Sequence, residues 1–177
     1  MRYAMARARM ILAIFSVGLA FGIHAQDTSS SGGKLSSNDR SFILQATGGG
    51  MNEVELSKIA LQKSAAADIK AFAQQMVDDH EKAGKELAMI SAKLGAAPSK
   101  PMGEPTADIR RFGELKGETL DKAYIGKMVD GHKGAIALFE KQAKSADAAE
   151  LKQFASNALP VLKGHLKSAL ALAEKGK

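Results

Sequence analysis

Apolar residues recur with helical spacing along two long segments of the chain, and each segment is interrupted once by a short run of small residues. The first extends over residues 38–94 with an interruption near 65–67, and the second over 118–174 with an interruption near 145–148. No stretch alternates apolar and polar residues with the period of a strand. The pattern predicts an all-α fold with four helices, at about 38–64, 67–94, 118–144 and 148–174.

A linker is expected between the two periodic segments. Residues 95–117 contain several glycines and three of the four prolines, at Pro98, Pro101 and Pro105. A linker of ~20 residues, each spanning up to ~3.3 Å, can run the length of a helix of ~40 Å. The second and third helices can therefore run parallel, joined by a long crossover.

The two halves of the domain repeat one another at an offset of 82 residues, with no gap. Asp39-Arg-Ser-Phe42 aligns with Asp121-Lys-Ala-Tyr124, and Asp68-Ile-Lys-x-Phe-Ala73 aligns with Glu150-Leu-Lys-x-Phe-Ala155. Two helical hairpins related in this way form an antiparallel four-helix bundle with a pseudo-twofold axis. With the long crossover, the predicted architecture of residues 38–174 is a ferritin-like bundle rather than a simple up-down-up-down bundle.

One phrase occurs on two of the predicted helices. Phe72-x-x-x-Met76-Val-Asp-x-His80 recurs as Tyr124-x-x-x-Met128-Val-Asp-x-His132. The aromatic residue, Met and His lie on one helical face, while the Asp (Asp78 or Asp130) points away. The phrase therefore places a histidine on the apolar stripe of two different helices.

Each of the four helices contributes one inward polar residue. His80 and His132 are central on their stripes, His165 lies nearer the edge of its stripe, and Glu53 occupies the matching position on the first helix. Their distances from the helix turns put them at similar heights, within roughly one helical turn. Glu53, His80, His132 and His165 thus form a candidate N₃O ligand set for a single Zn, Cu or Fe ion.

Structural interpretations of this layer remain open beside the metal site. A core histidine is commonly satisfied by a backbone carbonyl or a carboxylate. A buried Glu and three His can also form a hydrogen-bonded network that sets helix register without a metal. If the glycines at 48–50 break the first helix, it restarts at Asn52 and Glu53 becomes a first-turn acid. We favour a continuous or kinked helix.

Other residues near the layer admit two interpretations. Met76 and Met128 could serve as soft Cu(I) ligands, but methionines on a helical stripe more often fill a core. Pro160 lies one turn before His165 and is expected to kink or split the last helix. Asp79 is close enough to the interface to orient a ligand histidine.

The N-terminus has the pattern of a signal peptide. Arg2, Arg7 and Arg9 precede an apolar run over residues 10–23, and Ala25 is a small residue at the expected cleavage position. We expect cleavage after Ala25, a flexible Ser/Gly-rich leader over 26–37, and a periplasmic or secreted protein. A retained N-terminal anchor is the alternative, although the run is shorter than the about 20 residues that span a bilayer.

Signal cleavage also changes the charge balance. It removes three of the 25 basic residues and no acid, so the net charge falls from +6 to 22 − 19 = +3. The remaining basic residues are interleaved with acids, which argues against nucleic acid as a partner. Without cysteine the chain forms no disulfide or thiolate metal site. A homo-oligomer or a partner in the cell envelope is compatible with this composition.

The chain resembles a bacterial family of exported ferritin-like proteins known as domain of unknown function 4142. The resemblance covers about residues 38–174 and rests on four motifs: Gly49-Gly50-x-x-Glu53-Val-Glu-Leu, Val77-x-Asp79-His80, Tyr124-x-x-x-Met128-Val-x-x-His132 and Leu159-Pro160-x-Leu-x-x-His165-Leu. It implies a ferritin-like bundle in the cell envelope, without an established activity.

The sequence argues against di-iron chemistry. Ferritin-like di-iron sites use a Glu from each of two helices and a Glu-x-x-His motif from each of the other two. Here Val77, Val129 and Leu162 stand three residues before each His, so the carboxylates of a ferroxidase or oxygenase are absent. We expect a non-catalytic bundle that binds a single metal ion, or alternatively a structural or partner-binding envelope domain. An oxidase or metal-storage enzyme is the third hypothesis.

Overall fold

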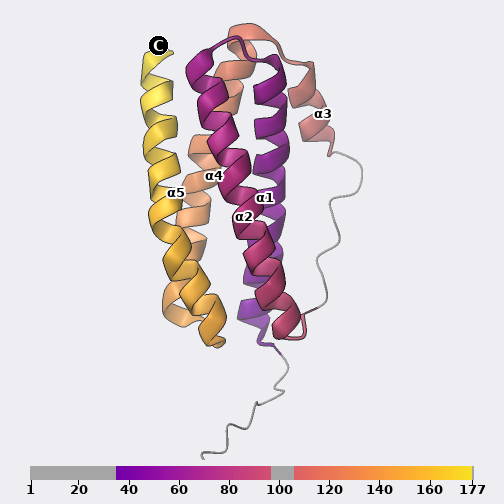
Figure 1. The fold of residues 1–177 in the computed structure, drawn as a ribbon, viewed down its shortest axis with the longest axis vertical. Helices are drawn as coiled ribbons and strands as arrows, with labels where there is room; N and C mark the ends of the chain where they lie inside the picture. Colours follow the sequence, from indigo (N-terminus) through magenta and orange to yellow (C-terminus); the bar gives the residue numbers. More distant parts are fainter. Residues whose placement is uncertain (1–34, 97–105, 177) are drawn as a thin grey trace, which may run out of the picture. The chain divides into compact units, whose positions relative to one another are not determined.

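The protein is all-helical over the residues that the structure, a computed structural model, describes, which are 35–96 and 106–176. These ranges contain four long helices, one short helix and no strand, arranged as Figure 1 shows. The helices are α1 (Ser37–Lys63), α2 (Ala67–Lys93), α3 (Ala107–Glu114), α4 (Gly117–Ser145) and α5 (Ala149–Lys175). The predicted signal peptide and most of the predicted leader lie outside the described residues.

Local hydrogen bonds define where several helices begin and end. The side chain of Ser36 accepts from the Asp39 N–H at 3.1 Å before α1, and that of Thr106 accepts from the Ile109 N–H at 3.3 Å before α3. Each bond satisfies an amide that has no partner inside its helix. After α2 the chain turns at Gly95, whose φ of 69° is readily adopted by glycine.

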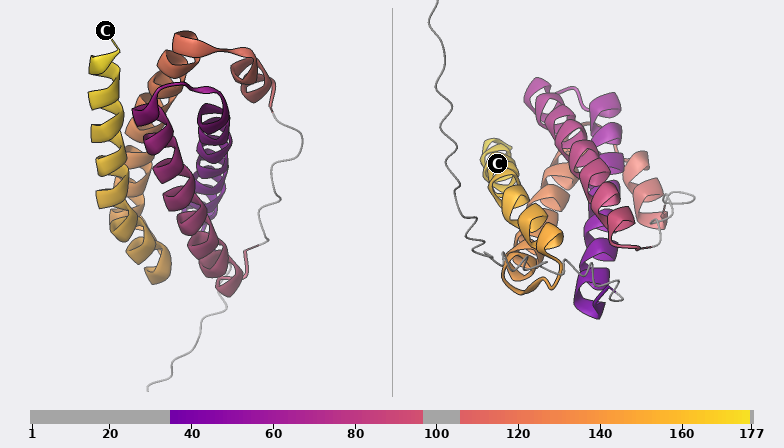
Figure 2. Two further views of the ribbon diagram at one scale, coloured as in Figure 1. Left: turned by 45° about the horizontal axis from the view of Figure 1, so that its top comes forward. Right: turned by 60° about the horizontal axis from the view of Figure 1, so that its bottom comes forward.

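The four long helices form two antiparallel hairpins that pack side by side. α1 pairs with α2 and α4 pairs with α5, while α1 also contacts α4 and α2 contacts α5. Figures 1 and 2 show α2 and α4 running in the same direction. α3 lies against α1 near the end of the bundle where α4 begins, and the side-chain amine of Lys63 donates to the carbonyl of Gly113.

Three details of the helices differ from, or decide between, the sequence-based expectations. α3 forms inside the stretch 95–117 that the sequence assigned to a linker, because Ile109 and Phe112 bury against the core. α1 is continuous through Gly48–Gly50, so the restart at Asn52 does not occur. α5 is not split at Pro160, although Figure 1 shows it bending near its middle.

The apolar core is divided into two clusters by the polar layer. The cluster nearer the α1–α2 turn is built around Leu56, Phe72 and Tyr124, and Ile109 and Phe112 of α3 join it. The cluster nearer the α4–α5 turn contains Phe42, Phe139 and Phe154, whose rings meet at centroid distances of 5.0 to 6.4 Å. The four inward polar residues lie between these clusters.

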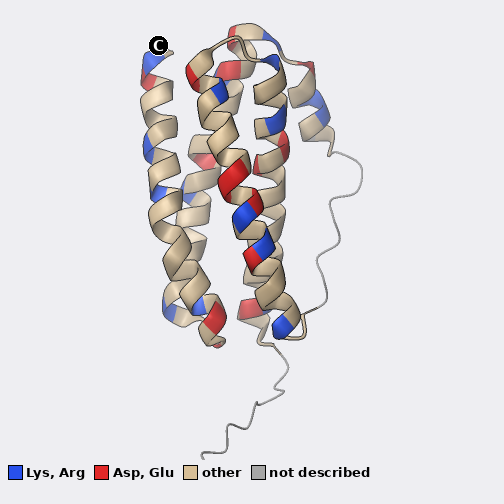
Figure 3. Ribbon diagram, in the orientation of Figure 1, with Lys and Arg blue, Asp and Glu red and all other residues tan. Residues whose placement is uncertain are grey.

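Charged residues of both signs are distributed along the outside of the helices. Figure 3 shows Lys or Arg interspersed with Asp or Glu on α2 and its neighbours. Several form exposed pairs, among them Lys58 with Glu81 at 3.2 Å and Lys163 with Glu140 at 2.7 Å. No described helix combines the length and the apolar character needed to cross a membrane.

Candidate metal centre

Residues from all four long helices meet in a polar layer at mid-height of the bundle. Glu53 comes from α1, His80 from α2, His132 from α4 and His165 from α5. The side chains of His132 and His165 are 0% and 1% exposed, and those of Glu53 and His80 are each 10% exposed. The three imidazole rings have centroid distances of 5.3 to 5.6 Å. The structure thus brings together the four residues that helical spacing predicts to face inward.

Hydrogen bonds fix the ring protons of His132 and His165. Nδ1 of His132 lies 2.9 Å from the carbonyl oxygen of Met128, which can only accept, so Nδ1 carries the hydrogen. Nε2 of His165 lies 2.9 Å from Oδ2 of Asp79 and likewise donates. The two remaining nitrogens, Nε2 of His132 and Nδ1 of His165, are 3.3 Å apart. In neutral rings both of these atoms carry lone pairs, and the lone pairs face each other.

The α1–α2 side of the layer is less well bonded. Nε2 of His80 is buried and has no hydrogen-bond partner among the described residues. Glu53 Oε2 lies 3.4 Å from this nitrogen and Glu53 Oε1 lies 3.5 Å from Nδ1 of His132, and neither contact is a hydrogen bond. A Cβ atom at Gly131 would stand 2.5 Å from Glu53 Oε1. Glycine at 131 therefore makes room for the Glu53 carboxylate.

Burial controls the ionisation of the layer. Desolvation raises the pKa of Glu53 to about 7. It lowers the pKa of His80 to about 3, reinforced by the neighbouring rings of His132 and His165 and opposed by Asp79. Desolvation also lowers the pKa of His132 to about 4, although the hydrogen bond to Met128 opposes it. Near neutral pH His80 and His132 are therefore neutral, which is the form of imidazole that binds metal ions.

Three of the four residues are arranged so that they could hold one metal ion. One nitrogen each of His80, His132 and His165 can be chosen so that all three lie within 4.8 Å of one another. In a tetrahedral site with metal–nitrogen bonds of about 2.0–2.1 Å, ligand atoms are roughly 3.3 Å apart. The separation between His132 Nε2 and His165 Nδ1 is already 3.3 Å. Glu53 lies beside this group, next to the protonated nitrogen of His132.

The neighbours of the layer follow the helical faces predicted from the sequence. Asp79 bonds to His165, as expected for a residue that orients a histidine. Asp78 and Asp130 are exposed. Met76 and Met128 are fully buried in the cluster near the α1–α2 turn, which agrees with the packing interpretation of these methionines.

A second buried polar network, which was not predicted from the sequence, lies near the α4–α5 turn. The Asp39 side chain accepts from Nε2 of Gln142 at 2.6 Å through Oδ1, and from the N–H of Ala148 at 2.8 Å through Oδ2. The bond to Ala148 caps the start of α5, where no local side chain does so. Asp39 precedes buried Phe42 by three residues, so helical spacing already placed it on the inner face.

Comparison with protein families gives one assignment. The family model described as “Domain of unknown function (DUF4142)” matches residues 24–172. This is the family that the four sequence motifs resemble. Among curated proteins no match to the chain is found.

Solved structures with the same arrangement of helices are found at low sequence identity. A “DUF305 fragment from Deinococcus radiodurans” superposes with a TM-score of 0.70 at 13% identity, over 80% of this chain and 98% of the other. “CopM in the Cu(II)-bound form” gives 0.67 at 16% identity, over 78% and 97%. “CopM in the Cu(I)-bound form” gives 0.67 at 18% identity, over 77% and 95%. At these identities the likeness concerns the helical fold alone.

Proposed function

The chain belongs to the DUF4142 family, and we propose that it is an exported, non-catalytic helical bundle that binds one transition metal ion at His80, His132 and His165. In this proposal the two hairpins and the crossover between α2 and α4 form a ferritin-like bundle. Glu53 is the carboxylate that completes the site or balances the charge of the ion.

One observation carries the metal proposal. The protons on His132 and His165 are held by Met128 and Asp79, so the two nitrogens that face each other at 3.3 Å both present lone pairs when the rings are neutral. Two facing lone pairs repel each other, and a cation bound to both nitrogens removes the repulsion. Metal-bound histidines commonly donate their other N–H to a carbonyl or a carboxylate, as these two do.

The remaining residues of the layer fit the same role. His80 offers a buried ring nitrogen without a hydrogen-bond partner. The Glu53 carboxyl group is desolvated and lies 3.4 Å from that nitrogen, and a bound cation would favour its charged form. Three imidazole rings and one carboxylate offer a divalent ion four donors, one of them able to carry a negative charge.

Imidazole donors bind Zn, Cu and Fe, and the lack of thiolate ligands does not distinguish among these three metals. Copper is the first to test, since the structural neighbours include a protein described in Cu(II)-bound and Cu(I)-bound forms. Di-iron chemistry is not part of the proposal, because Val77, Val129 and Leu162 stand where Glu-x-x-His motifs would need carboxylates.

A structural role for the layer is the second candidate. It is favoured by the hydrogen bonds of His132 to Met128 and of His165 to Asp79, the second of which links α5 to α2. In that case the layer sets the register of the helices and binds no ion. The unpartnered nitrogen of His80 and the poorly bonded carboxylate of Glu53 count against it.

Elemental analysis of protein purified from its own compartment, without a His tag, tests the metal proposal. We expect about one metal ion per chain in the unmodified protein and loss of that ion in the His80→Ala/His132→Ala double variant. The matched control is Asp78→Ala/Asp130→Ala, which alters the exposed acids of the same repeated phrase and is expected to keep the ion. Metal-free protein that also fails to take up Cu, Zn or Fe in vitro would exclude the proposal.

Export is tested on the same preparation. N-terminal sequencing of the protein from the periplasm or the medium is expected to begin at Gln26, after cleavage following Ala25. Protein that keeps residues 1–25 and sediments with membranes would support the retained anchor instead. The family match begins at residue 24, close to the expected cleavage point.

A further inference from the structure

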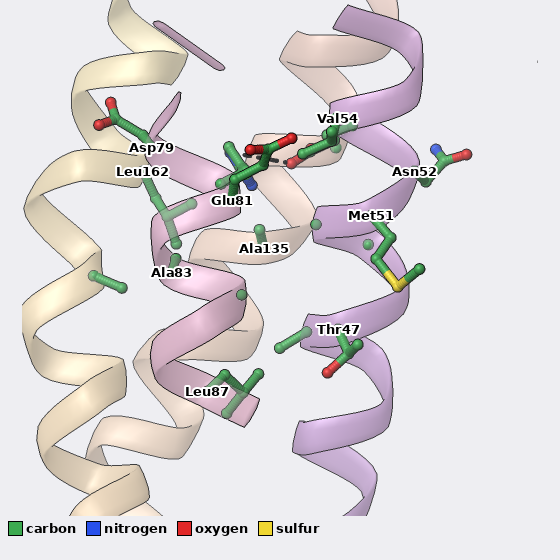
Figure 4. A pocket seen from close by; sticks show the side chains of 18 of the residues that line it. Thr47, Met51, Asn52, Val54, Asp79, Glu81, Ala83, Leu87, Ala135 and Leu162 are labelled. Carbon is green, nitrogen blue, oxygen red and sulfur yellow. Dashed lines mark ion pairs between the residues drawn. The ribbon is translucent and has the colours of Figure 1, made fainter. Parts of the chain in front are cut away.

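A large cavity lies beside the polar layer, on the side of the α4–α5 turn. Its volume is about 1630 Å³, and residues of α1, α2, α4 and α5 line it. Figure 4 shows Ala83, Leu87, Ala135 and Leu162 around this space. At one end it reaches Glu53, His80 and His165, and toward the other end it is lined by Leu87, Phe139 and Phe154. Between these two ends the inner wall is mainly apolar, while exposed polar side chains such as Lys82, Lys85 and Asn157 also line the cavity.

The internal repeat explains why there is space at this level. The repeat relates the four polar residues to four other positions, all of which line the cavity: His132 to Gly50, His165 to Ala83, Glu53 to Ala135 and His80 to Leu162. Three of these four counterparts are glycine or alanine. Where one level of the bundle is filled by three imidazoles and a carboxylate, the level related to it carries one leucine, two alanines and one glycine.

The polar end of the cavity limits what it can bind. The His80 side chain is 10% exposed, and its Nδ1 would lie 3.7 Å from a Cβ atom at Gly50, which also lines the cavity. The carboxylates of Glu53 and Asp79 also border the cavity. Lys82, Lys85 and Lys127 also line the cavity, but they are exposed, so the charged groups at its less exposed end are carboxylates. There they oppose an anionic group, whereas a hydroxyl group can both donate and accept a hydrogen bond.

We propose that this cavity binds a neutral, mainly apolar small molecule with a single hydroxyl group, of the class of long-chain alcohols. The hydroxyl group contacts His80 at the polar layer, and the hydrocarbon part lies between Ala83, Ala135 and Leu162. A mainly apolar pocket with a few convergent polar groups is the usual form of a small-molecule site. The proposal concerns the metal-free protein and does not require the ion proposed above.

The first test uses a neutral apolar fluorophore, N-phenyl-1-naphthylamine, with protein kept metal-free by a chelator. We expect saturable binding, and about a tenfold or greater loss of affinity in Ala135→Leu, because the larger side chain fills the cavity. Ala137→Leu is the matched control, since Ala137 is exposed on the same helix and does not border the cavity. Absence of saturable binding, or equal affinity of the two variants, would overturn the proposal.

Folding of the variants is checked by circular dichroism and thermal melting. If Ala135→Leu does not fold, Ala158→Leu on α5 fills the cavity from another helix and is judged by the same criterion. Because the binding measurement is made without metal, its result can contradict the cavity proposal while the metal proposal holds. Likewise, the metal proposal can be contradicted while the cavity proposal holds.

The second test addresses the hydroxyl group by competition. We expect 1-decanol to displace the fluorophore at a concentration at least about tenfold lower than decanoate, because the anion would meet Glu53 and Asp79. In His80→Phe the advantage of 1-decanol over decanoate is expected to shrink, while the fluorophore itself still binds. Decanoate that competes as well as 1-decanol would overturn the assignment of a neutral head group.

Discussion

Two buried polar clusters among the described residues differ in how completely they are hydrogen-bonded. In the cluster around Asp39 both carboxylate oxygens accept good hydrogen bonds, from Gln142 at 2.6 Å and from Ala148 at 2.8 Å. In the layer around Glu53 both carboxylate oxygens stand 3.4 to 3.5 Å from histidine nitrogens without a hydrogen bond. Both carboxylates are buried, so exposure does not account for the difference.

The contrast separates a structural network from a candidate site. A buried polar group that serves the fold is normally satisfied by the fold itself. The Asp39 cluster meets this condition and joins the start of α1 to the end of α4 and the start of α5. The Glu53–His80 part of the layer does not, and a buried group without partners calls for an explanation such as the binding of an ion or ligand.

The largest effect on stability is expected from removing the Asp39 carboxylate, whose two oxygens both accept hydrogen bonds. Asp39→Ala leaves the buried Gln142 amide and the partly buried Ala148 N–H without an acceptor, and we expect a loss of about 4 kcal/mol in the free energy of unfolding. Urea denaturation measures it.

The control for this substitution is Asp121→Ala, at the position that the repeat relates to Asp39. Oδ1 of Asp121 is buried and has no hydrogen-bond partner among the described residues. The counterpart of Gln142 is Ala60, and the N–H of Ala66, the counterpart of Ala148, bonds to Ser64 instead. We expect a change within about 1 kcal/mol. Equal losses in the two variants would contradict the distinction between them.

An intermediate effect is expected from Glu53→Gln in metal-free protein. Because burial raises the pKa of Glu53 from 4.5 to about 7, the folded protein holds a proton that the unfolded chain has released between these pH values. The contribution of Glu53 to stability is thus present below pH 4.5 and is lost as the pH rises to about 7. At about 1.36 kcal/mol per pH unit, the loss amounts to roughly 3 kcal/mol.

Denaturation at several pH values tests this effect. The stability of the unmodified protein minus that of Glu53→Gln should fall by roughly 3 kcal/mol between about pH 4 and pH 8. Contributions of His80 and His132 occur in both proteins and largely cancel in the difference. A difference that does not vary with pH would show that the Glu53 carboxylate is satisfied in the folded state.

The smallest effect concerns two glycines on α4. A Cβ atom at Gly134 would meet nothing within 4 Å, so Gly134→Ala should gain about 1 kcal/mol from helix propensity. At Gly131 the added Cβ atom would stand 2.5 Å from Oε1 of Glu53, and the carboxylate would have to move. We expect Gly131→Ala to gain less than Gly134→Ala in thermal melting. An equal gain would mean that the position of the Glu53 carboxylate does not depend on the absence of a side chain at Gly131.

Hydrophobic periodicity predicted the four long helices well because each buries a regular stripe. The first was expected at about 38–64 and is Ser37–Lys63. α3 was missed because it has only two buried apolar residues, Ile109 and Phe112, in a stretch that follows three prolines. Contact with α1 stabilises α3, and this contact cannot be predicted from the local sequence.

The membership of the polar layer was also predictable, whereas its bonding was not. Helical angles and the internal repeat sufficed to predict that four residues face inward: Glu53, His80, His132 and His165. Which nitrogens are bonded depends on ring rotations and on shifts of less than one helical turn. The same limit applies to Asp39 and Asp121, since identical residues at repeated positions differ in bonding only through their neighbours on other helices.

The layer also connects parts of the chain that are far apart in sequence. His80 and His165 are separated by 165 − 80 = 85 positions, and His132 lies between them. In the unfolded chain, holding these residues together would cost loop-closure entropy that grows with the logarithm of the separation. An ion bound by all three would therefore act as a reversible cross-link that exists only in the folded protein. Its binding free energy would add to the free energy of unfolding and would disappear when a chelator removes the ion.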